Sequence, residues 1–404
     1  MDIRKNFKRE VLDNGMTLLF EKRDVPVVSI GIAVRSGGAN ENSDEKGISH
    51  FIEHLLYKGT PTRSAFIIAE EIEKKGGELN GFTEEDLTAY WCKLPSEYAE
   101  TGLNVLIDMV RNPLFSPDEI EKERKVIFEE IKMRHDNPMQ YVFDKIQSFL
   151  YESPFGEDLI GNEKTMGSIN KEKILEKFKR TYTPNNLIIC VVGNYNFAKL
   201  RNIIKETFEF RDGSVSKIEI KKRNESKTEK RKGIDQANVV FAFHSPLLGE
   251  NCAYASEVLR GIMTGGMSSR LFTEIREKRN LAYSILGDSK LRKDYAYSLI
   301  YVGTTKDNVE KIKELIIAEL KKVSEELSEK ELESVKEQLT GNYEISTEDS
   351  QVQMTNLLFS ECSGSAADFY DYREKILDVE LEDVKSLAAE AAIKYSFFAL
   401  VPED

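Results

Sequence analysis

The 404-residue sequence lacks several features that would assign it to a specialised class of protein. It has no run of eighteen apolar residues, so we expect no membrane-spanning helix. Its four cysteines lie far apart and form no C-x-x-C pair, so we expect reduced thiols rather than disulfides. The first ten residues lack the apolar core of a signal peptide, and they contain acids, which a transit peptide avoids. These absences predict a cytoplasmic protein.

Basic residues are outnumbered by acidic ones. The chain has 57 Lys and Arg against 70 Asp and Glu, for a net charge of −13. This balance disfavours nucleic acid as a partner and favours basic peptides, provided that the acids line a cavity. With 40% hydrophobic and 31% charged residues the composition is that of a globular protein, and the length predicts two domains.

Histidine is scarce, with four in the chain, yet two of them fall in one short motif. His50, Glu53 and His54 form H-x-x-E-H, and on a helix their side chains emerge on one face. Two neutral imidazoles at this spacing can hold one zinc ion, with the carboxylate beside the open coordination position. That carboxylate could take a proton from a water molecule and pass it to a leaving amine. Chance alignment on a solvated helix face is the alternative, but the flanking Ile, Phe and Leu residues argue against it.

A later helical pattern over residues 116–131 supplies two more carboxylates. One face of this helix is formed by Glu123, Val126, Ile127 and Glu130. Carboxylates on a partly apolar face need a partner, and a zinc ion would be one. We therefore predict Glu130 as the third zinc ligand and Glu123 as a residue that hydrogen-bonds a ligand imidazole. Without the histidine motif, inward ion pairs to Arg124 or Arg134 would be the better interpretation.

The first half of the chain also predicts a sheet. A tight-turn signal at Asp13-Asn14-Gly15 separates two short β patterns, and Val27 to Val34 alternates as a strand does. Glu78 to Phe82 and Leu87 to Leu94 predict a strand pair, in which the first, polar segment suits a sheet edge. An edge strand can capture an extended peptide by main-chain pairing, although an ordinary polar hairpin is the better interpretation of this segment alone.

The domain organisation follows from composition and from repetition. We place a polar linker at 213–234, between an N-terminal catalytic zinc-binding domain at 1–212 and a C-terminal domain at 235–404. Strand, two helices, strand pair, long helices and final strand occur in the same order in both halves, which predicts an internal duplication. The predicted fold class is α+β, with two duplicated domains that each pack a mainly antiparallel sheet against helices.

Together, these motifs resemble the pitrilysin/insulysin-type zinc peptidases. Within them the chain resembles the short processing-peptidase branch, which includes the mitochondrial processing peptidase β subunit and bacterial relatives. The matching motifs are His50-Phe51-Ile52-Glu53-His54, Glu123-x6-Glu130, Gly76-Gly77-x-x-Asn80, Tyr182-x-Pro184-Asn185-Asn186-Leu187 and Gly265 to Leu271. Three positions depart from the family pattern. Gly81 replaces a usual alanine, and Thr264 and Asn280 stand where glycine is common.

The resemblance implies one zinc ion per chain, with Glu53 as the general base. The implied ligands are His50, His54 and Glu130. A peptide substrate would bind as an added strand along the edge formed by Asn80, Gly81 and Phe82. The resemblance also implies that Arg276 and Tyr283 of the second half reach the substrate, where a cation and a phenol can polarise the scissile carbonyl.

Larger members of this family fuse two such chains into a closed chamber. The resemblance therefore implies that this chain forms half of a clamshell and pairs with itself or with a sister chain. The predicted function is a zinc-dependent endopeptidase that hydrolyses short or unfolded peptides in that chamber. The main alternative is a non-catalytic structural or chaperone-like subunit, although such subunits usually lose the metal motif or the arginine–tyrosine pair. A non-catalytic zinc module is a weaker alternative, because closed structural sites usually have four protein ligands that include Cys.

Overall fold

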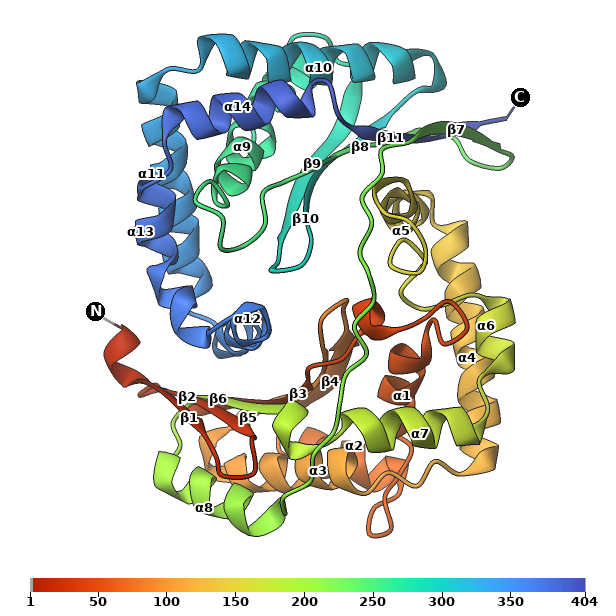
Figure 1. Ribbon diagram of the computed structural model, residues 1–404, viewed down its shortest axis with the longest axis vertical. Helices are drawn as coiled ribbons and strands as arrows, with labels where there is room; N and C mark the ends of the chain where they lie inside the picture. Colours follow the sequence, from red (N-terminus) through yellow and green to blue (C-terminus); the bar gives the residue numbers. More distant parts are fainter. Residues whose placement is uncertain (1–2, 404) are drawn as a thin grey trace. The chain divides into compact units, whose positions relative to one another are not determined.

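The computed structural model describes residues 3–403, and the chain divides into two compact units (Figure 1). Unit 1 comprises the chain up to Ile131 together with Asp158–Glu219 and Ser346–Tyr370. Unit 2 comprises Lys132–Glu157, Ile220–Ile345 and the chain from Asp371 onward. Each unit contains one β-sheet packed against helices, so the fold class is α+β, as predicted.

The sheet of unit 1 has six strands in the order β1-β2-β6-β3-β5-β4. Their bounds are Phe7–Val11 (β1), Thr17–Lys22 (β2), Val27–Val34 (β3), Glu78–Thr83 (β4), Thr88–Pro95 (β5) and Leu187–Gly193 (β6). The predicted hairpin between β1 and β2 is present, and Gly15 in its turn has the positive φ that favours glycine. All neighbouring strands are antiparallel except β2 and β6. Strand β4 lies at an edge, as its polar sequence predicted.

The sheet of unit 2 repeats this arrangement with five strands in the order β7-β11-β8-β10-β9. Their bounds are Ser226–Arg231 (β7), Ala237–His244 (β8), Ala282–Leu291 (β9), Ala296–Thr304 (β10) and Ser396–Pro402 (β11). Its only parallel pair is β7 with β11, at the place that β2 and β6 occupy in unit 1. The matching order and direction of five strands support the predicted duplication.

Strand β7 lies within the segment that we predicted as a linker, residues 213–234, so that part of the prediction is wrong. The segment is polar because β7 is an edge strand with mostly exposed side chains. An edge strand is held by main-chain pairing on one side, here with β11, and needs few apolar side chains. The absence of large apolar residues therefore indicated exposure and not the absence of regular structure.

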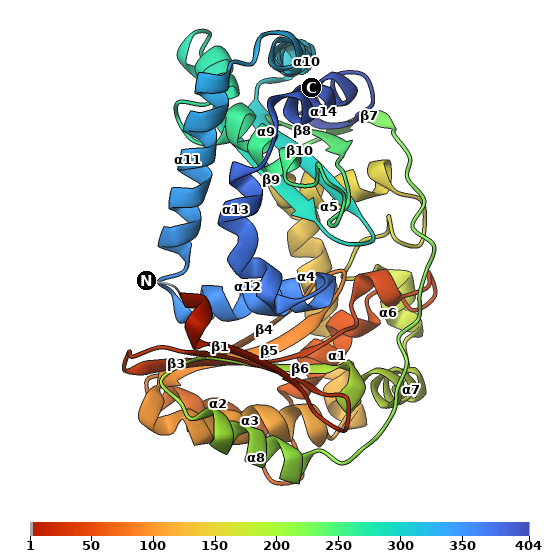
Figure 2. The ribbon, with the colours of Figure 1, turned by 60° about the vertical axis from the view of Figure 1, so that its left-hand side comes forward.

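Helices cover both faces of the unit 1 sheet. In Figure 2 the sheet is seen edge-on, with α2, α3 and α8 on one side and α12 on the other. The helices of this unit are α1 (Ile48–Leu56), α2 (Ala65–Glu73), α3 (Ala99–Arg111), most of α4 (Pro117–Asp136), α6 (Glu163–Ser168), α7 (Lys171–Thr181), α8 (Phe197–Thr207) and α12 (Ser350–Ser363). Across both units, short 3-10 turns occur at Ile3–Asn6, Gly38–Asn40, Ser96–Tyr98, Pro184–Asn186, Lys306–Asn308 and Ala366–Asp371.

In unit 2 the two sheet faces can be told apart along β11. Phe397, Ala399 and Val401 pack with α10 and α14, while Phe398 stacks on Phe149 of α5. The helices of this unit are α5 (Pro138–Leu150), α9 (Ala255–Thr264), α10 (Val309–Glu326), α11 (Glu329–Ser346), α13 (Tyr372–Leu377) and α14 (Leu381–Ala391), with a π-helix at Phe272–Glu277. Alternating side chains of one strand thus face two helical layers.

The halves of the chain exchange one equivalent helix. Helix α5 comes from the first half but packs on β8 and β11 of unit 2, and α12 comes from the second half but packs on β3 and β6 of unit 1. Both helices follow the long helix of their own half, α4 and α11. The compact units therefore depart from the predicted halves at 132–157 and at 346–370.

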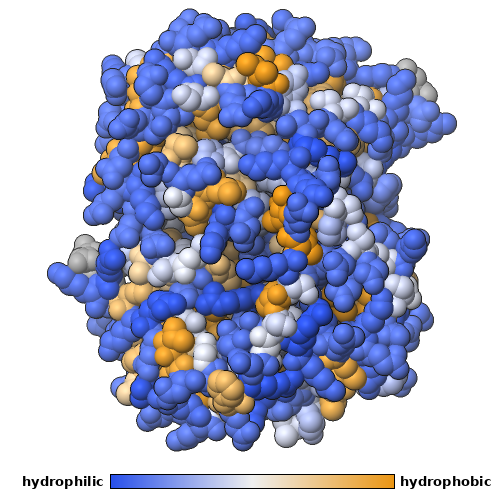
Figure 3. All heavy atoms as spheres, viewed as in Figure 1, coloured by the Kyte–Doolittle hydropathy of each residue, from blue (hydrophilic) through white to orange (hydrophobic). Residues whose placement is uncertain are grey.

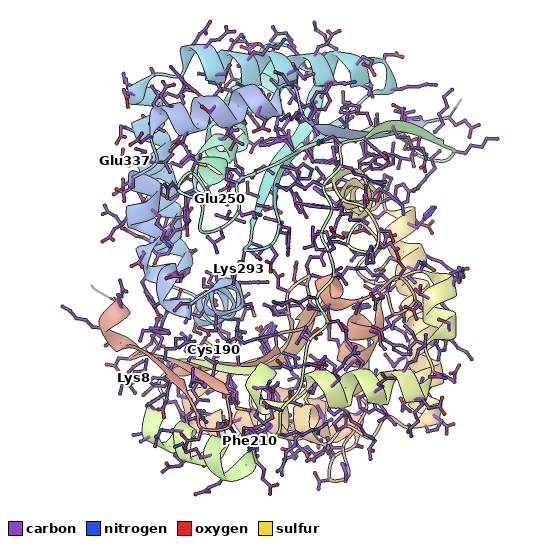
Figure 4. The ribbon with its side chains drawn as sticks, viewed as in Figure 1. Lys8, Cys190, Phe210, Glu250, Lys293 and Glu337 are labelled. Atoms are coloured by element: carbon purple, nitrogen blue, oxygen red, sulfur yellow. The ribbon has the colours of Figure 1, made fainter. Side chains whose placement is uncertain are left out.

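Small side chains on β3 make room for α12. Val28, Ile30, Ile32 and Val34 fill one core, and the other face of the strand carries Ser29, Gly31 and Ala33. A Cβ on Gly31 would lie 2.7 Å from the sulfur of Met354, and Ser29 and Ser350 share a hydrogen bond of 2.8 Å. Cys190 on the neighbouring strand lies in the same layer, between the sheet and α12 (Figure 4). The predicted strand is present, and both of its faces are buried.

Two buried carboxylates fasten α12 to the rest of unit 1. Glu361 accepts hydrogen bonds from Arg9 at 2.8 Å and from Arg35 at 2.9 Å. Glu21 accepts from the Gln353 amide at 2.7 Å and pairs with Arg23. Because each buried acid has a cation and further donors, the cost of removing its charge from water is offset.

The surface has no extended apolar band in the view of Figure 3, where apolar side chains form small separate groups among hydrophilic ones. Within residues 3–403, no helix combines the length and the hydrophobicity needed to cross a membrane.

One departure from the family pattern has a direct structural explanation. Asn280 follows the π-helix and has a φ of 52°, in the left-handed region. Glycine is the usual residue in that region, and asparagine tolerates it better than other residues with a Cβ. Asparagine at 280 thus suits a backbone position that glycine would also suit.

We expect Asn280→Ala to lower the free energy of unfolding by about 1 kcal/mol, because alanine must adopt the left-handed conformation without asparagine's tolerance for it. Urea unfolding measures the change. Asn280→Gly is the matched control and should cost little. Equal stability of the Ala variant and the native chain would show that the backbone at 280 imposes no such requirement.

Candidate metal centre

Helix α1 carries the H-x-x-E-H motif, and its other side is anchored in the unit 1 core. Ile48, Phe51, Ile52, Leu55 and Leu56 are all buried there. The apolar side fixes the rotation of the helix, so the motif residues must emerge together on its remaining face. The rings of His50 and His54 lie 4.7 Å apart, edge to face.

A buried acid that the sequence analysis did not identify holds the start of α1. Glu41 is fully buried and accepts hydrogen bonds from the main-chain N–H groups of Gly47, at 2.9 Å, and Ser49, at 2.7 Å. These amides lie at the helix N-terminus, where they lack partners within the helix and where negative charge is favoured. Glu41 therefore helps to fix the position of the metal-motif helix.

Helix α4 brings a carboxylate to both histidines. One oxygen of Glu130, Oε2, lies 3.6 Å from Nε2 of His50 and 3.6 Å from Nε2 of His54. Potential ligand atoms of the three residues lie within 4.8 Å of one another, the one such group found within residues 3–403.

The spacing of these atoms suits an ion better than direct hydrogen bonds. A separation of 3.6 Å is too long for a good N–H···O hydrogen bond. Two ligands of a tetrahedral zinc ion, each about 2.0–2.1 Å from the metal, are about 3.3 Å apart. Two imidazoles and one carboxylate also match the donor set of many catalytic zinc sites, in which a fourth position stays open. The residues present therefore fit zinc.

Glu123 lies about two helical turns before Glu130 on α4. It contacts Nδ1 of His54, the ring nitrogen that faces away from Glu130. Its Oε2 lies 3.2 Å from Nδ1 of His54, and its Oε1 forms an ion pair of 2.8 Å with Lys58. A carboxylate on Nδ1 fixes the imidazole tautomer that leaves Nε2 free to bind metal. The predicted contact of Glu123 with a histidine is present, whereas Lys58 was not predicted.

The Glu53 carboxylate lies beside this group. Its Oε2 accepts a hydrogen bond of 2.7 Å from the Thr83 hydroxyl of β4. Burial raises the pKa of Glu53 above its ordinary value, and the Thr83 hydrogen bond opposes that shift only in part. A carboxyl with a raised pKa is suited to accepting a proton and giving it back.

Tyr57, just after α1, lies close to Gly81 on the same face of β4 as Glu53. A Cβ on Gly81 would be 2.5 Å from the Tyr57 hydroxyl oxygen and 3.3 Å from a carboxylate oxygen of Glu53. The family's usual alanine would therefore collide with Tyr57 here. Burial, followed by the charge of Glu53, keeps the pKa of the Tyr57 phenol well above its ordinary value, so the hydroxyl stays protonated.

The predicted substrate-strand residues divide between the two faces of β4. Asn80 is exposed, and its side-chain oxygen accepts a hydrogen bond of 2.8 Å from the Gly81 N–H. Phe82 stacks on Phe359 of α12, with ring centroids 5.7 Å apart, on the face opposite the metal helix. Thr83 points to Glu53, so only alternate residues of the strand face the candidate centre.

Arg276 and Tyr283 both belong to unit 2, where they lie together. The Arg276 guanidinium is 4.8 Å from the Phe272 ring centroid and 5.3 Å from that of Tyr283, which are cation–π distances. Arg276 extends from the π-helix, an uncommon conformation that occurs frequently at functional sites. Tyr283 is 79% exposed.

The sequence analysis was wrong about Val126 and overlooked three contributors. Val126 is 48% exposed, although it was assigned to the inward face of α4. Lys58 could have been found, since it lies four residues after His54. The alternation of β4 places Thr83 on the same side as Gly81, which was a second usable signal. Glu41 lies in a loop, and no periodicity indicated it.

Comparison with known proteins agrees with this geometry. Residues 17–163 match the family model of insulinase, peptidase family M16, and residues 168–339 match the model of the peptidase M16 inactive domain. An uncharacterized zinc protease of Rickettsia felis is 34% identical over 344 residues, 84% of each chain. The chain belongs to peptidase family M16. The uncharacterized zinc protease YmxG of Bacillus subtilis is a second relative, 33% identical over 86% of each chain.

Solved structures extend the likeness over the whole M16 fold. A protease from Helicobacter pylori has a TM-score of 0.90 at 22% identity, over 98% of this chain and 99% of that one. A putative M16-like peptidase from Alicyclobacillus acidocaldarius has a TM-score of 0.86 at 17% identity, over 98% of both chains. The names of the sequence relatives support zinc as the metal, and the group of potential ligands lies in the part that matches the insulinase model.

Removing the Glu123 carboxylate should weaken metal binding without removing a ligand atom. We expect Glu123→Ala to lower zinc affinity by about 10- to 100-fold, because His54 would lose the partner that orients it. Competition with a chromophoric chelator measures the affinity. Glu121→Ala on the same helix, an exposed acid paired with Arg124, is the matched control. Equal affinities for the two variants would contradict the role of Glu123.

The charges around His54 predict a pH dependence. Burial lowers the pKa of His54, but the carboxylates of Glu130, Glu53 and Glu123 outweigh burial and raise it above the ordinary value. In the metal-free protein, the stability contributed by protonated His54 is present below a pH of about 6.5 and is lost as the pH rises through the folded pKa.

Zinc binding should show the opposite trend. Zinc needs the neutral ring, so its affinity should fall as the pH drops below the folded pKa, and binding there should release a proton. Chelator titrations across the pH range, with calorimetry in buffers of different ionisation enthalpy, measure both effects. Zinc affinity that is independent of pH below about 6.5 would contradict the assignment of His54.

Proposed function

We propose that this M16-family chain is a zinc-dependent endopeptidase that hydrolyses short or unfolded peptides within an enclosed chamber. The observation that carries the proposal is the convergence of two imidazoles and one carboxylate, His50, His54 and Glu130, with ligand atoms within 4.8 Å. Glu53 extends from the same helix face as the two histidines, next to the position that such a site leaves open.

Glu53 is the general base of this proposal. A zinc ion held by the three ligands would act as a Lewis acid, polarising a carbonyl and making a nearby water molecule more acidic. Glu53 accepts the proton of the attacking water and donates it to the amine that leaves. Its raised pKa supports this assignment, because the group must hold the proton between the two transfers.

The edge strand β4 is the proposed substrate platform. One side of β4 pairs with β5, and its other side ends the sheet. An extended peptide can add there through main-chain hydrogen bonds, which are the same for every sequence. Short or unfolded peptides can adopt the extended form, whereas a folded protein cannot present its main chain in this way.

Arg276 and Tyr283 belong to the proposal through the family resemblance. A guanidinium and a phenol near the scissile carbonyl would stabilise the negative charge that develops on its oxygen. Their mutual cation–π contact supports a joint role, because each restricts the orientation of the other.

A non-catalytic subunit is the second candidate, since a family model for an inactive domain matches residues 168–339. That match does not include the H-x-x-E-H helix or Glu130, which fall within residues 17–163. The presence of the ligand group together with Glu53 favours the enzyme.

The decisive variant is Glu53→Gln, which keeps the size of the side chain but cannot accept the proton. We expect zinc content to be unchanged and hydrolysis of a random peptide pool to fall by about 10²- to 10⁴-fold. His50→Ala is the matched control and should lose zinc itself. Zinc per chain and sequenced cleavage products are the two readouts.

Backbone N-methylation of a cleaved peptide at alternate residues tests the platform, because it removes main-chain donors and keeps the side chains. Two peptides are compared, one methylated at odd-numbered and one at even-numbered residues. Only one of them should bind Glu53→Gln more weakly, because the main-chain N–H groups of alternate residues point toward β4.

Normal turnover by Glu53→Gln would remove Glu53 from the mechanism. A zinc-loaded native chain without activity would favour the non-catalytic subunit.

A further inference from the structure

The Thr83 hydroxyl is the hydrogen-bond donor that holds the Glu53 carboxylate. It lies 2.7 Å from Glu53 Oε2 and extends from the last residue of β4. Across residues 3–403, no other group donates a hydrogen bond to Glu53. The nearby Tyr57 hydroxyl has no hydrogen-bond partner within the same residues, so it does not share this task.

Thr83 has a rigid support of its own. It pairs with Thr88 across the hairpin, and the N–H of Glu84 donates to the Leu87 carbonyl at 2.9 Å to close the turn. Two main-chain hydrogen bonds, from Gly38 to Glu84 and from Ala39 to Glu85, tie this turn to the segment before α1. The position of the hydroxyl is thus set by the backbone on both sides of Thr83.

A glutamate needs such a contact if it is to act as a base. Its side chain has three rotatable bonds, and each must be ordered at a cost in entropy. A general base must also stay within hydrogen-bond reach of the proton that it takes, and a misplacement of about 1 Å can cost a factor of about 10² in rate. One short hydrogen bond from a fixed strand meets this requirement.

We propose that Thr83 is a positioning residue that fixes the Glu53 carboxylate from the same strand that pairs with the substrate peptide. The inference rests on the proposed peptidase function and connects the substrate strand β4 with the base Glu53. The strand that receives the peptide thus also places the base, through the hydroxyl of Thr83. Thr83 acts through its hydrogen bond to Glu53 and takes no proton itself.

The test compares Thr83→Val, which removes the hydroxyl at nearly constant shape, with Thr83→Ser, which restores it. We expect Thr83→Val to lower kcat by about 10- to 100-fold with little change in KM and with full zinc content. Thr83→Ser should recover most of kcat. Thr88→Val is the matched control, because it deletes a buried threonine hydroxyl, which donates to the Ser36 carbonyl, from the paired strand position. It should leave kcat unchanged.

A second measurement needs neither metal nor substrate. In the metal-free protein, the thermal unfolding midpoint is determined for Glu53→Ala, Thr83→Val and the double variant. If the two side chains are bonded, the double variant should lose less than the sum of the single losses. If Thr83→Val does not fold, Thr83→Ala replaces it in both experiments.

The outcomes separate this inference from the function on which it rests. Hydrolysis by the native chain with an unchanged kcat for Thr83→Val would overturn the inference and leave the peptidase in place. A reduced kcat that Thr83→Ser does not restore would also overturn it, since the hydroxyl would not be the cause. If the native zinc-loaded chain is inactive, the peptidase proposal fails. Independently of that result, unfolding-midpoint losses that add up in the double variant would show that Thr83 does not hold Glu53.

Discussion

The candidate centre depends on one spacing, the 3.6 Å that separates a single oxygen of Glu130 from the inner nitrogens of His50 and His54. At this distance the three groups do not satisfy one another by direct hydrogen bonding, and they leave room for a cation between them. Several contacts within unit 1 hold these groups at this spacing. The apolar side of α1 fixes its rotation, Glu41 holds its first turn, and Glu123 with Lys58 holds the outer side of His54.

The duplication explains how one fold can hold a site in only one of its halves. Five strands of each unit have the same order and directions, and equivalent helices cover them. Helix α9 follows β8 as α1 follows β3, but α9 contains no histidine and carries an ion pair between Glu257 and Arg260. The exchange of α5 and α12 makes each unit depend on the other half of the chain for one helical layer. Deleting either half would therefore expose a sheet face in the half that remains.

Sequence reasoning reached the metal group because its signals are local. Two histidines and a glutamate on one helix share a face by simple periodicity, and the same rule selected Glu123 and Glu130 on α4. It failed at Val126, because periodicity defines a face but not how far the neighbouring elements extend over it. It also could not find the layer formed by α12, since the small residues of β3 look the same whether they face solvent or a helix. The polar strand β7 was missed for the related reason that edge strands need little apolar area.

The central claim is that two imidazoles and one carboxylate bind a single zinc ion that keeps one position open. Zinc-edge X-ray absorption of the protein loaded with one equivalent of zinc tests this most directly. The account predicts only nitrogen and oxygen neighbours, at about 2.0–2.2 Å, with the outer-shell pattern of two imidazoles. A sulfur neighbour at about 2.3 Å, or a spectrum that His50→Ala leaves unchanged, would contradict it.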